Sequence, residues 1–390
     1  MKDFVFNVNT KILFGKKSVE KIGRELKDRG VKHVLFCYGG GSIKRNGLYD
    51  RIVSILKEEG IDYCELSGIK PNPRIESVRE GVKISRENNV DFILAVGGGS
   101  TIDCAKAIAA GIHYEGDPWD LVISKAPIKS ATPIGAVLTL AATGSEMDPF
   151  GVITNPKTKE KIGFSSELVL PVFAVMDPTV TYTLPQKQTM AGIADIMSHT
   201  MENYFSKEED CYLQDKFAEG ILKTCIKYAR VLKEDPENYE ARANVMWASS
   251  WAINGLISTG KGTSWTVHPI EHELSAHYDI THGVGLALLT PAFLTHILSD
   301  EAVNKISEFA YNVFDIEPTE DKFKDAEKGI EALYNFFKEM DIPMSLRELS
   351  IDDSLFEEMA EHALSVSTIE TKSYVSLTKE DIVEIYRKAL

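Results

Sequence analysis

Long apolar runs and positive charge are both scarce in this 390-residue sequence. No stretch is long and apolar enough to span a membrane, and the first residues, MKDFVFNVNT, lack the apolar core of a signal peptide. We therefore expect a cytoplasmic protein. Lys and Arg number 43 against 58 Asp and Glu, and the net charge of −15 argues against nucleic acid or an anionic membrane as a partner.

Cysteine is also scarce, and its placement excludes a disulfide framework. The five cysteines are Cys37, Cys64, Cys104, Cys211 and Cys225. They are dispersed and odd in number, and none forms a C-x-x-C pair. A reduced compartment fits this pattern, and a thiolate-rich zinc site is not expected.

The first half of the chain alternates between strand-like and helix-like stretches. The strand-like runs are 4–8, 11–14, 31–38, 61–67, 91–96, 134–140, 150–155, 159–164 and 173–177. The helical patterns are 18–29, 47–59, 75–88 and 101–110. This alternation predicts a parallel sheet with helices on both faces, whose ligands bind beyond the carboxyl ends of the strands.

A glycine cluster at one such strand end suits a phosphate group. Its residues are Gly97, Gly98, Gly99 and Ser100, and the run from Ser100 to Asp103 resembles a capping box. Backbone N–H groups at a helix start, unobstructed by side chains, suit a pyrophosphate, although a tight turn without a ligand reads the same way. The turn that runs from Thr139 through Thr143 to Glu146 suits a polar ligand or a plain loop. Lys161 is a candidate ribose or phosphate contact, or an exposed strand lysine.

A second glycine cluster, after the strand 31–38, bears on the choice of cofactor. Its residues are Gly39, Gly40, Gly41 and Ser42, followed by Lys44 and Arg45. In NAD-binding βαβ units, an acidic side chain after the second strand commonly binds the ribose 2′-hydroxyl and repels a 2′-phosphate. Here amides, a hydroxyl and two cations occupy that place. We expect NADP(H) to be preferred over NAD(H), unless the two cations are ordinary surface charges.

From residue 186 onward the periodicity is almost entirely helical. We therefore expect two domains, a dinucleotide-binding domain at 1–185 and an all-helical domain at 186–390. The helical patterns of the second half include 188–205, 211–232, 239–256 and 267–277.

Histidines gather in this second half at helical spacing. Asp195 and His199 are four residues apart, as are His268 and His272, and such pairs lie on one face of a helix. We interpret Asp195, His199, His268 and His282 as ligands of one divalent metal. A carboxylate with three imidazoles suits Fe²⁺ or Zn²⁺, whereas scattered core or surface histidines are the alternative. His272 should point into the same cavity, and Gly283 would let the backbone approach closely.

These motifs together carry a family resemblance across essentially the whole chain. They are LFCYGGGSIKRNG, GIKPNP, AVGGGSTIDCAKAIA, TLAATGSEM, DPTVTYTLP, AGIADIMSH and HPIEHELSAHYDITHG. The chain resembles iron-dependent (group III) alcohol dehydrogenases, close to their NADP(H)-dependent butanol dehydrogenase and aldehyde reductase branch.

The resemblance implies a fold, a site and an oligomeric state. The fold would be dehydroquinate-synthase-like, with an α/β Rossmann-like N-terminal domain and an all-α C-terminal domain, commonly as a homodimer. It implies metal ligation by the same four residues. The implied cofactor contacts are Gly97, Gly98 and Ser100 at the pyrophosphate, and Asn72, Asp103, Thr139, Thr143 and Lys161 elsewhere. His272 matches a histidine near the nicotinamide and is a candidate for proton relay or positioning. NAD-preferring relatives carry Asp where this chain has Gly40.

The expected reaction is reversible hydride transfer between NADP(H) and a small primary alcohol or aldehyde, such as butanol or butanal. A polyol dehydrogenase of the glycerol or propanediol type, using NAD(H), is the alternative within the same fold. A dehydroquinate-synthase-like cyclase would need clustered cations near the metal, where only Lys261 stands. A non-catalytic NADP-binding or metal-storage protein would lack a ligand or a glycine loop, and both are present.

Overall fold

Six short apolar stretches pair as one parallel sheet in the computed structural model, which describes residues 1–208, 210–262 and 265–390. The strand order is β1-β8-β5-β4-β2-β3. The strands are β1 (Lys11–Phe14), β2 (His33–Tyr38), β3 (Asp62–Leu66), β4 (Phe92–Gly97), β5 (Ile134–Leu138) and β8 (Phe173–Met176). Because all six are parallel, their carboxyl ends lie along one edge of the sheet.

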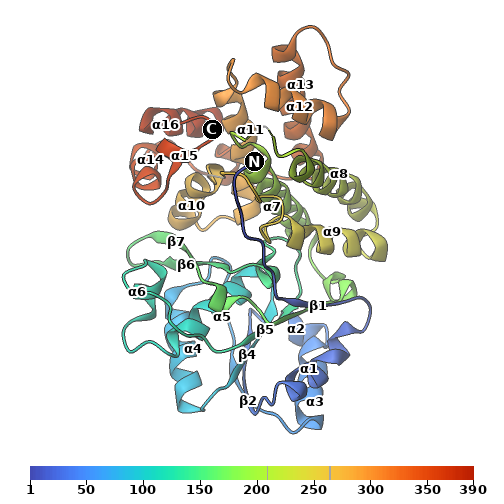
Figure 1. The fold of residues 1–390 in the computed structure, drawn as a ribbon, viewed down its shortest axis with the longest axis vertical. Helices are drawn as coiled ribbons and strands as arrows, with labels where there is room; N and C mark the ends of the chain where they lie inside the picture. The colour runs from blue at the N-terminus through green and yellow to red at the C-terminus, as the bar shows by residue number, and fades with distance from the viewer. Residues whose placement is uncertain (209, 263–264) are drawn as a thin grey trace. The chain divides into compact units, whose positions relative to one another are not determined.

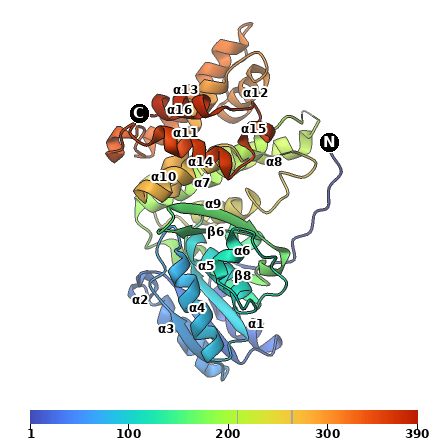
Figure 2. The same cartoon turned by 90° about the vertical axis from the view of Figure 1, so that its left-hand side faces the viewer.

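Alternate residues of the central strands pack on opposite faces of this sheet. In β2, Leu35 and Cys37 join one hydrophobic core, whereas Val34 and Phe36 join another. The first core contains residues of α4 (Ile75–Glu87), α5 (Gly99–Gly111) and α6 (Pro118–Val122), and the second contains residues of α1 (Ile22–Asp28) and α3 (Leu48–Glu58). Figure 2 shows α4 and α5 side by side over the sheet. The predicted parallel sheet with helices on both faces is confirmed.

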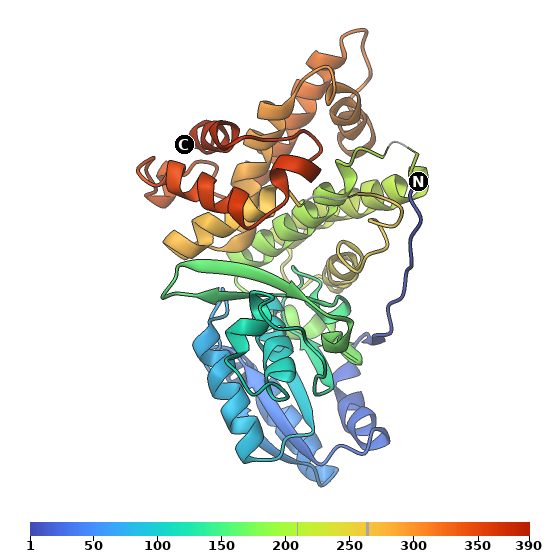
Figure 3. The same ribbon diagram turned by 60° about the vertical axis from the view of Figure 1, so that its left-hand side comes forward.

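A separate antiparallel hairpin follows β5. Its strands are β6 (Phe150–Asn155) and β7 (Glu160–Ser165), drawn in green in Figure 3. Across the hairpin, Thr154 pairs with Lys161, and the backbone N–H of Thr154 donates to the carbonyl of Pro73, 2.8 Å away. The loop after β3 is therefore fastened to the hairpin.

The strand predicted at 4–8 is wrong. These residues form no strand, and the side chain of Val5 is 95% exposed. A short apolar run makes a strand only where another strand accepts its hydrogen bonds, and no described strand pairs with this segment.

The second half of the chain is helical, and α7 (Gln186–Tyr204) is its most buried helix. The other helices are α8 (Tyr212–Glu234), α10 (Val267–Tyr278), α11 (His282–Ile297), α12 (Val303–Phe314), α13 (Lys322–Glu339), α14 (Phe356–Ser365), α15 (Ile369–Lys372) and α16 (Lys379–Lys388). Every residue from Thr189 to Tyr204 is buried. The helix α7 packs against α8 and α11, and α11 packs against α10 (Figure 1). Polar side chains on α7 consequently need partners inside the protein.

The chain divides into two units by its internal contacts. The sheet unit comprises Asn7–Leu184 and Glu237–Ser250, and the helical unit comprises Met1–Phe6, Pro185–Pro236 and Trp251–Leu390. A single cut after residue 185 would assign two segments differently, namely residues 1–6 and most of α9 (Tyr239–Trp251). No helix in the described part of the chain combines the length and apolar content needed to cross a membrane.

Candidate functional site

Four side chains from three helices converge in the helical unit. Asp195 and His199 lie one turn apart on α7, His268 lies in the first turn of α10, and His282 begins α11. One ligand atom from each lies within 4.8 Å of all the others. The Nε2 atoms of His199 and His282 are 3.6 and 3.7 Å from Oδ1 of Asp195. The structure thus brings together the four residues that the sequence nominates as ligands.

The chemistry of this cluster fits a divalent metal. Oδ1 of Asp195 and Nε2 of His268 are buried, and no described residue offers either of them a hydrogen-bond partner. Leaving such atoms unsatisfied in the interior is unfavourable, and a cation would satisfy both. Burial lowers the pKa of His199 to about 3, so its imidazole is neutral and its lone pair is available. One carboxylate oxygen and three imidazole nitrogens suit Fe²⁺ or Zn²⁺.

Two buried carboxylates that the sequence reasoning missed contact the ligand histidines. Glu202 on α7 accepts a hydrogen bond from Nδ1 of His268 at 2.9 Å. Glu271 on α10 accepts one from Nδ1 of His282. The available signal was their spacing, because each glutamate follows a candidate ligand histidine by three residues on its own helix.

His272 lies beside the cluster without being part of the four. Its ring centroid is 5.4 Å from that of His282 and 6.3 Å from that of His268. Glu271, His272 and His282 also come close enough to share an ion. However, the Glu271 carboxylate already accepts from Ser275 and from Nδ1 of His282, and Nε2 of His282 faces Asp195. The second group of possible ligands, which shares His282 with the first, is therefore part of the same cluster and not a separate metal site.

In the sheet unit, the start of α5 carries no side-chain cap. The helix begins at Gly99, with Gly98 in extended conformation before it. The predicted capping box is wrong, because Asp103 points elsewhere. Its carboxylate accepts from the Ser145 hydroxyl at 2.6 Å and from the Val152 N–H at 3.0 Å, and burial raises its pKa to about 6. Asp103 thus fastens α5 to the 143–145 loop and to β6.

Close packing explains the glycines at this strand end. A methyl group on Gly97 would lie 2.3 Å from the hydroxyl oxygen of Thr101, and one on Gly99 would lie 2.2 Å from that of Thr143. The N–H of Thr139 donates to the carbonyl of Gly97 at 3.0 Å. The loops after β4 and β5 are therefore held against each other, and backbone N–H groups at the start of α5 are left to an anion.

The second glycine cluster follows β2 at the same edge of the sheet. Gly41 has φ 92°, a left-handed conformation that favours glycine, and a methyl group on Gly40 would meet no atom within 4 Å. Ser42 begins the short helix α2 (Ser42–Arg45). The ammonium of Lys44 lies 5.1 and 4.4 Å from the ring centroids of Tyr38 and Tyr49.

Two further predicted cofactor residues lie near the β6–β7 hairpin. Asn72 is buried in a left-handed conformation, φ 50°, next to Pro73, whose carbonyl accepts from Thr154. Lys161 is buried opposite Thr154. Lys161 is therefore not an exposed strand lysine. Binding of a cofactor at Asn72, Lys161 and the glycine loops stays a prediction.

Glycine loops at the carboxyl edge of a parallel sheet, together with a histidine-rich cluster on helices, are features of a metal- and nicotinamide-dependent dehydrogenase. The chain matches the family described as iron-containing alcohol dehydrogenase over residues 9–178, and its C-terminal family over residues 189–390. The chain belongs to the iron-containing alcohol dehydrogenase family, and it is a nicotinamide-dependent alcohol oxidoreductase.

Individual relatives agree with this assignment. The chain is 51% identical to NADH-dependent butanol dehydrogenase A of Clostridium acetobutylicum, with 100% of both chains covered. It is 41% identical to NADPH-dependent aldehyde reductase YqhD of Escherichia coli, over 94% of this chain and 95% of that protein. The crystal structure of NADH-dependent butanol dehydrogenase A from Thermotoga maritima has a TM-score of 0.96 at 42% identity, covering 100% of this chain and 99% of that one. The names of these relatives divide between the two nicotinamide cofactors.

Proposed function

We propose that this protein interconverts small aldehydes and primary alcohols, such as butanal and butanol, with NADP(H) at one divalent metal. Fe²⁺ or Zn²⁺ is held by Oδ1 of Asp195 and by His199, His268 and His282. The observation that carries this proposal is the convergence of four ligand atoms within 4.8 Å, two of them buried and without a partner in the described chain.

The reaction needs a group that polarises the carbonyl and a group that carries hydride. When bound, the metal supplies a Lewis acid for the substrate oxygen, and the nicotinamide supplies or accepts the hydride. The neutral imidazole of His199 and the carboxylate of Asp195 would be among the groups that hold the cation. His272, beside the ring of His282, gives or takes the proton of the alcohol, because imidazole titrates near neutral pH.

The loops of the sheet unit hold the cofactor. The uncapped start of α5 binds the pyrophosphate through backbone N–H groups, where the positive end of the helix dipole favours an anion. Hydrogen bonds from Ser145 to Asp103 and from Thr139 to Gly97 keep the neighbouring loops rigid. Thr143, Asn72 and Lys161 make the remaining polar contacts.

Preference for NADP(H) rests on the cluster after β2. The 2′-phosphate of NADP(H) lies against the backbone at Gly40, which no neighbouring atom obstructs. The Ser42 hydroxyl and the Lys44 ammonium are its further contacts. Lys44 lies over the rings of Tyr38 and Tyr49, and the hydroxyls of both tyrosines donate to Glu65. The contact with Tyr38 raises the pKa of Lys44, so this amine stays charged. A charged donor beside an open backbone supports binding of a phosphate.

Butanal reduction by the purified protein tests both parts of the proposal. NADPH and NADH are compared side by side after stripping with a chelator and after adding back Fe²⁺, Zn²⁺ or nothing. Metal-dependent turnover that is faster with NADPH is the expected result. Faster turnover with NADH would overturn the cofactor preference and leave the metal centre standing. Turnover only with glycerol or propanediol would replace the aldehyde reductase by a polyol dehydrogenase.

A further inference from the structure

The same four-residue pattern, His-x-x-Glu, occurs on two helices of the metal cluster. On α7 it is His199 to Glu202, and on α10 it is His268 to Glu271. Residues three apart share one helix face, so each glutamate accompanies its histidine toward the cluster. The glutamate on each of these helices accepts a hydrogen bond from the ligand histidine of the next helix in the cluster, Glu202 from His268 on α10 and Glu271 from His282 on α11.

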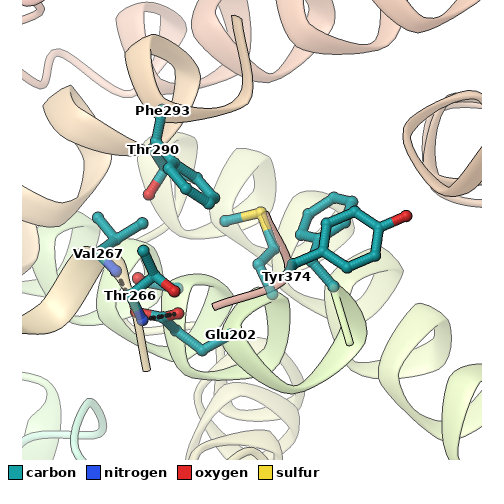
Figure 4. A pocket seen from close by; sticks show the side chains of 9 residues that line it. Glu202, Thr266, Val267, Thr290, Phe293 and Tyr374 are labelled. Carbon is teal, nitrogen blue, oxygen red and sulfur yellow. Dashed lines mark hydrogen bonds between the residues drawn. The ribbon is translucent and has the colours of Figure 1, made fainter. Parts of the chain in front are cut away.

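Glu202 holds His268 and the start of α10 together. Its carboxylate accepts from the backbone N–H groups of Thr266, Val267 and His268 at 2.7, 2.8 and 2.9 Å, and from Nδ1 of His268 at 2.9 Å. Figure 4 shows this carboxylate beside Thr266 and Val267, at the edge of a small pocket. Much of the pocket lining is apolar, with Met201, Phe205, Val267 and Phe293. In such surroundings the carboxylate's hydrogen bonds are strong and directional.

Glu271 holds His282 in the same way, by accepting a hydrogen bond from its Nδ1. It is fully buried, and its carboxylate accepts from the Ser275 hydroxyl and from Nδ1 of His282. Gly285, on the first turn of α11, leaves room for it. A methyl group at Gly285 would lie 2.7 Å from Cγ and 2.9 Å from Oε1 of Glu271.

We propose that Glu202 and Glu271 are positioning residues that set the affinity and geometry of the metal centre through His268 and His282. This inference rests on the metal centre of the proposed function. An ionised carboxylate can only accept, so each bond places the imidazole proton on Nδ1 and directs the lone pair of Nε2 at the cluster. Nε2 of His268 has no hydrogen-bond partner among the residues that the structure describes, and Nε2 of His282 faces Asp195.

The two carboxylates also change the charge around the ion. With Asp195, they place three carboxyl groups around a site in which the imidazole of His199 is neutral. A hydrogen bond to a carboxylate raises the basicity of an imidazole ligand and strengthens its bond to a metal. Nδ1 of His199, the third ligand histidine, has no partner among the described residues. Among the described residues, hydrogen bonds to carboxylates therefore adjust the basicity of the ligand histidines on α10 and α11, but not that of His199.

Glu271 is the better position for a test, because Glu202 has a second task. Glu202 also binds the backbone at the start of α10, so its replacement disturbs that helix as well as the histidine. Glu271→Gln keeps the size of the side chain and an acceptor oxygen but removes the charge. Glu273→Gln is a matched control on the same helix. Glu273 is buried and accepts from Nδ1 of His362 at 2.7 Å, and His362 is not one of the four ligands.

The experiment titrates metal-free full-length protein with Co²⁺ and follows the visible absorption of the bound ion. Affinity is measured by competition with a chelator, and circular dichroism checks folding. We expect Glu271→Gln to weaken Co²⁺ binding by roughly 10- to 100-fold and to change the absorption spectrum. Glu202→Gln should do the same and also lower the thermal midpoint. Glu273→Gln should bind Co²⁺ as the wild type does.

Failure of this inference differs from failure of the proposed function. If the wild type gives no saturable Co²⁺ spectrum, the metal centre itself is refuted. If the wild type binds Co²⁺ and Glu271→Gln matches it in affinity and spectrum, the positioning role is refuted. Equal weakening by Glu271→Gln and Glu273→Gln would also refute it, because the effect would then be general to buried carboxylates on α10.

Discussion

Gly283 of α11 lies against the backbone of Ala191 on α7, so closely that a methyl group there would be 2.0 Å from the Ala191 carbonyl oxygen. The same methyl group would be 3.3 Å from Cβ of Asp195. This approach brings His282, the residue before Gly283, to the ligands on α7. The close backbone approach predicted at Gly283 is confirmed.

Gly283→Ala should therefore damage the metal cluster. The clash is with the backbone of Ala191, which cannot rotate away as a side chain can, so α11 must move away from α7. Overpacking of this kind costs roughly 1–3 kcal/mol. We expect a lower thermal midpoint and at least tenfold weaker Co²⁺ binding. Gly220→Ala, on the exposed face of α8 with no atom within 4 Å, is the control and should stabilise the protein by about 0.5–1 kcal/mol. Unchanged metal binding in Gly283→Ala would contradict the close approach.

Substitution at Gly40 should reverse the cofactor preference. A carboxylate in Gly40→Asp would repel a 2′-phosphate, and a tenfold change in kcat/KM corresponds to about 1.4 kcal/mol. We expect kcat/KM with NADPH to fall at least tenfold, and kcat/KM with NADH to be maintained or raised. Lys44→Ala should lower only the NADPH value. Gly220→Asp, which changes the net charge equally, should alter neither. Equal losses with both cofactors would contradict a 2′-phosphate site at this loop.

Replacement of His272 should change the pH dependence of turnover. An asparagine keeps hydrogen bonding but cannot carry a proton, and positioned acid–base groups contribute roughly 10²- to 10⁴-fold. We expect His272→Asn to lower kcat and to flatten the pH–rate profile while Co²⁺ affinity is retained. His277→Asn on the same helix is the control. Full turnover of His272→Asn across the pH range would remove the proton-transfer role.

Glu146 in the sheet unit should make stability depend on pH. It is fully buried, it accepts a hydrogen bond from Ser250, and burial raises its pKa to about 7. A carboxyl group with a raised pKa in the fold favours the folded state when protonated. That contribution is complete below the unfolded value near 4.5 and is lost as pH rises toward 7.

Glu146→Gln should remove this loss. Near pH 5 the wild type and the variant should unfold at similar urea concentrations. Near pH 8 the variant should gain up to about 3 kcal/mol relative to the wild type, since each pKa unit corresponds to about 1.4 kcal/mol. Urea unfolding at the two pH values measures the difference. A gap between the two proteins that is constant with pH would show that Glu146 does not titrate inside the fold.

Local sequence patterns are sufficient to predict the central strands of the sheet and the shared face of the ligands on α7. The runs 31–38 and 91–96 are mostly apolar and are followed by glycines, and they match β2 and β4 to within two residues. The spacing of Asp195 and His199 predicted a shared face on a helix, which α7 provides. In each case the pattern and the fold depend on the same local geometry.

Elements that depend on distant partners could not be predicted in this way. The pairing of β1 with β8 joins residues far apart in the chain, and the segment 4–8 is mostly apolar but pairs with no described strand. The helix predicted at 239–256 ends at Trp251, before Gly255 at φ 93°. The hydrogen bond between Glu271 and His282 likewise depends on the packing of α11 against α10, which no local pattern shows.

The close packing of Glu271 against Gly285 restricts which substitutions the two positions can accept during evolution. The glutamate occupies the space that any side chain at position 285 would need. Substitutions at the two positions are therefore not independent. A lineage that acquires alanine at 285 must first shorten residue 271, and one that keeps glutamate at 271 must keep glycine at 285. The two positions should vary together among descendants of this sequence, fourteen residues apart, as though they were a single site.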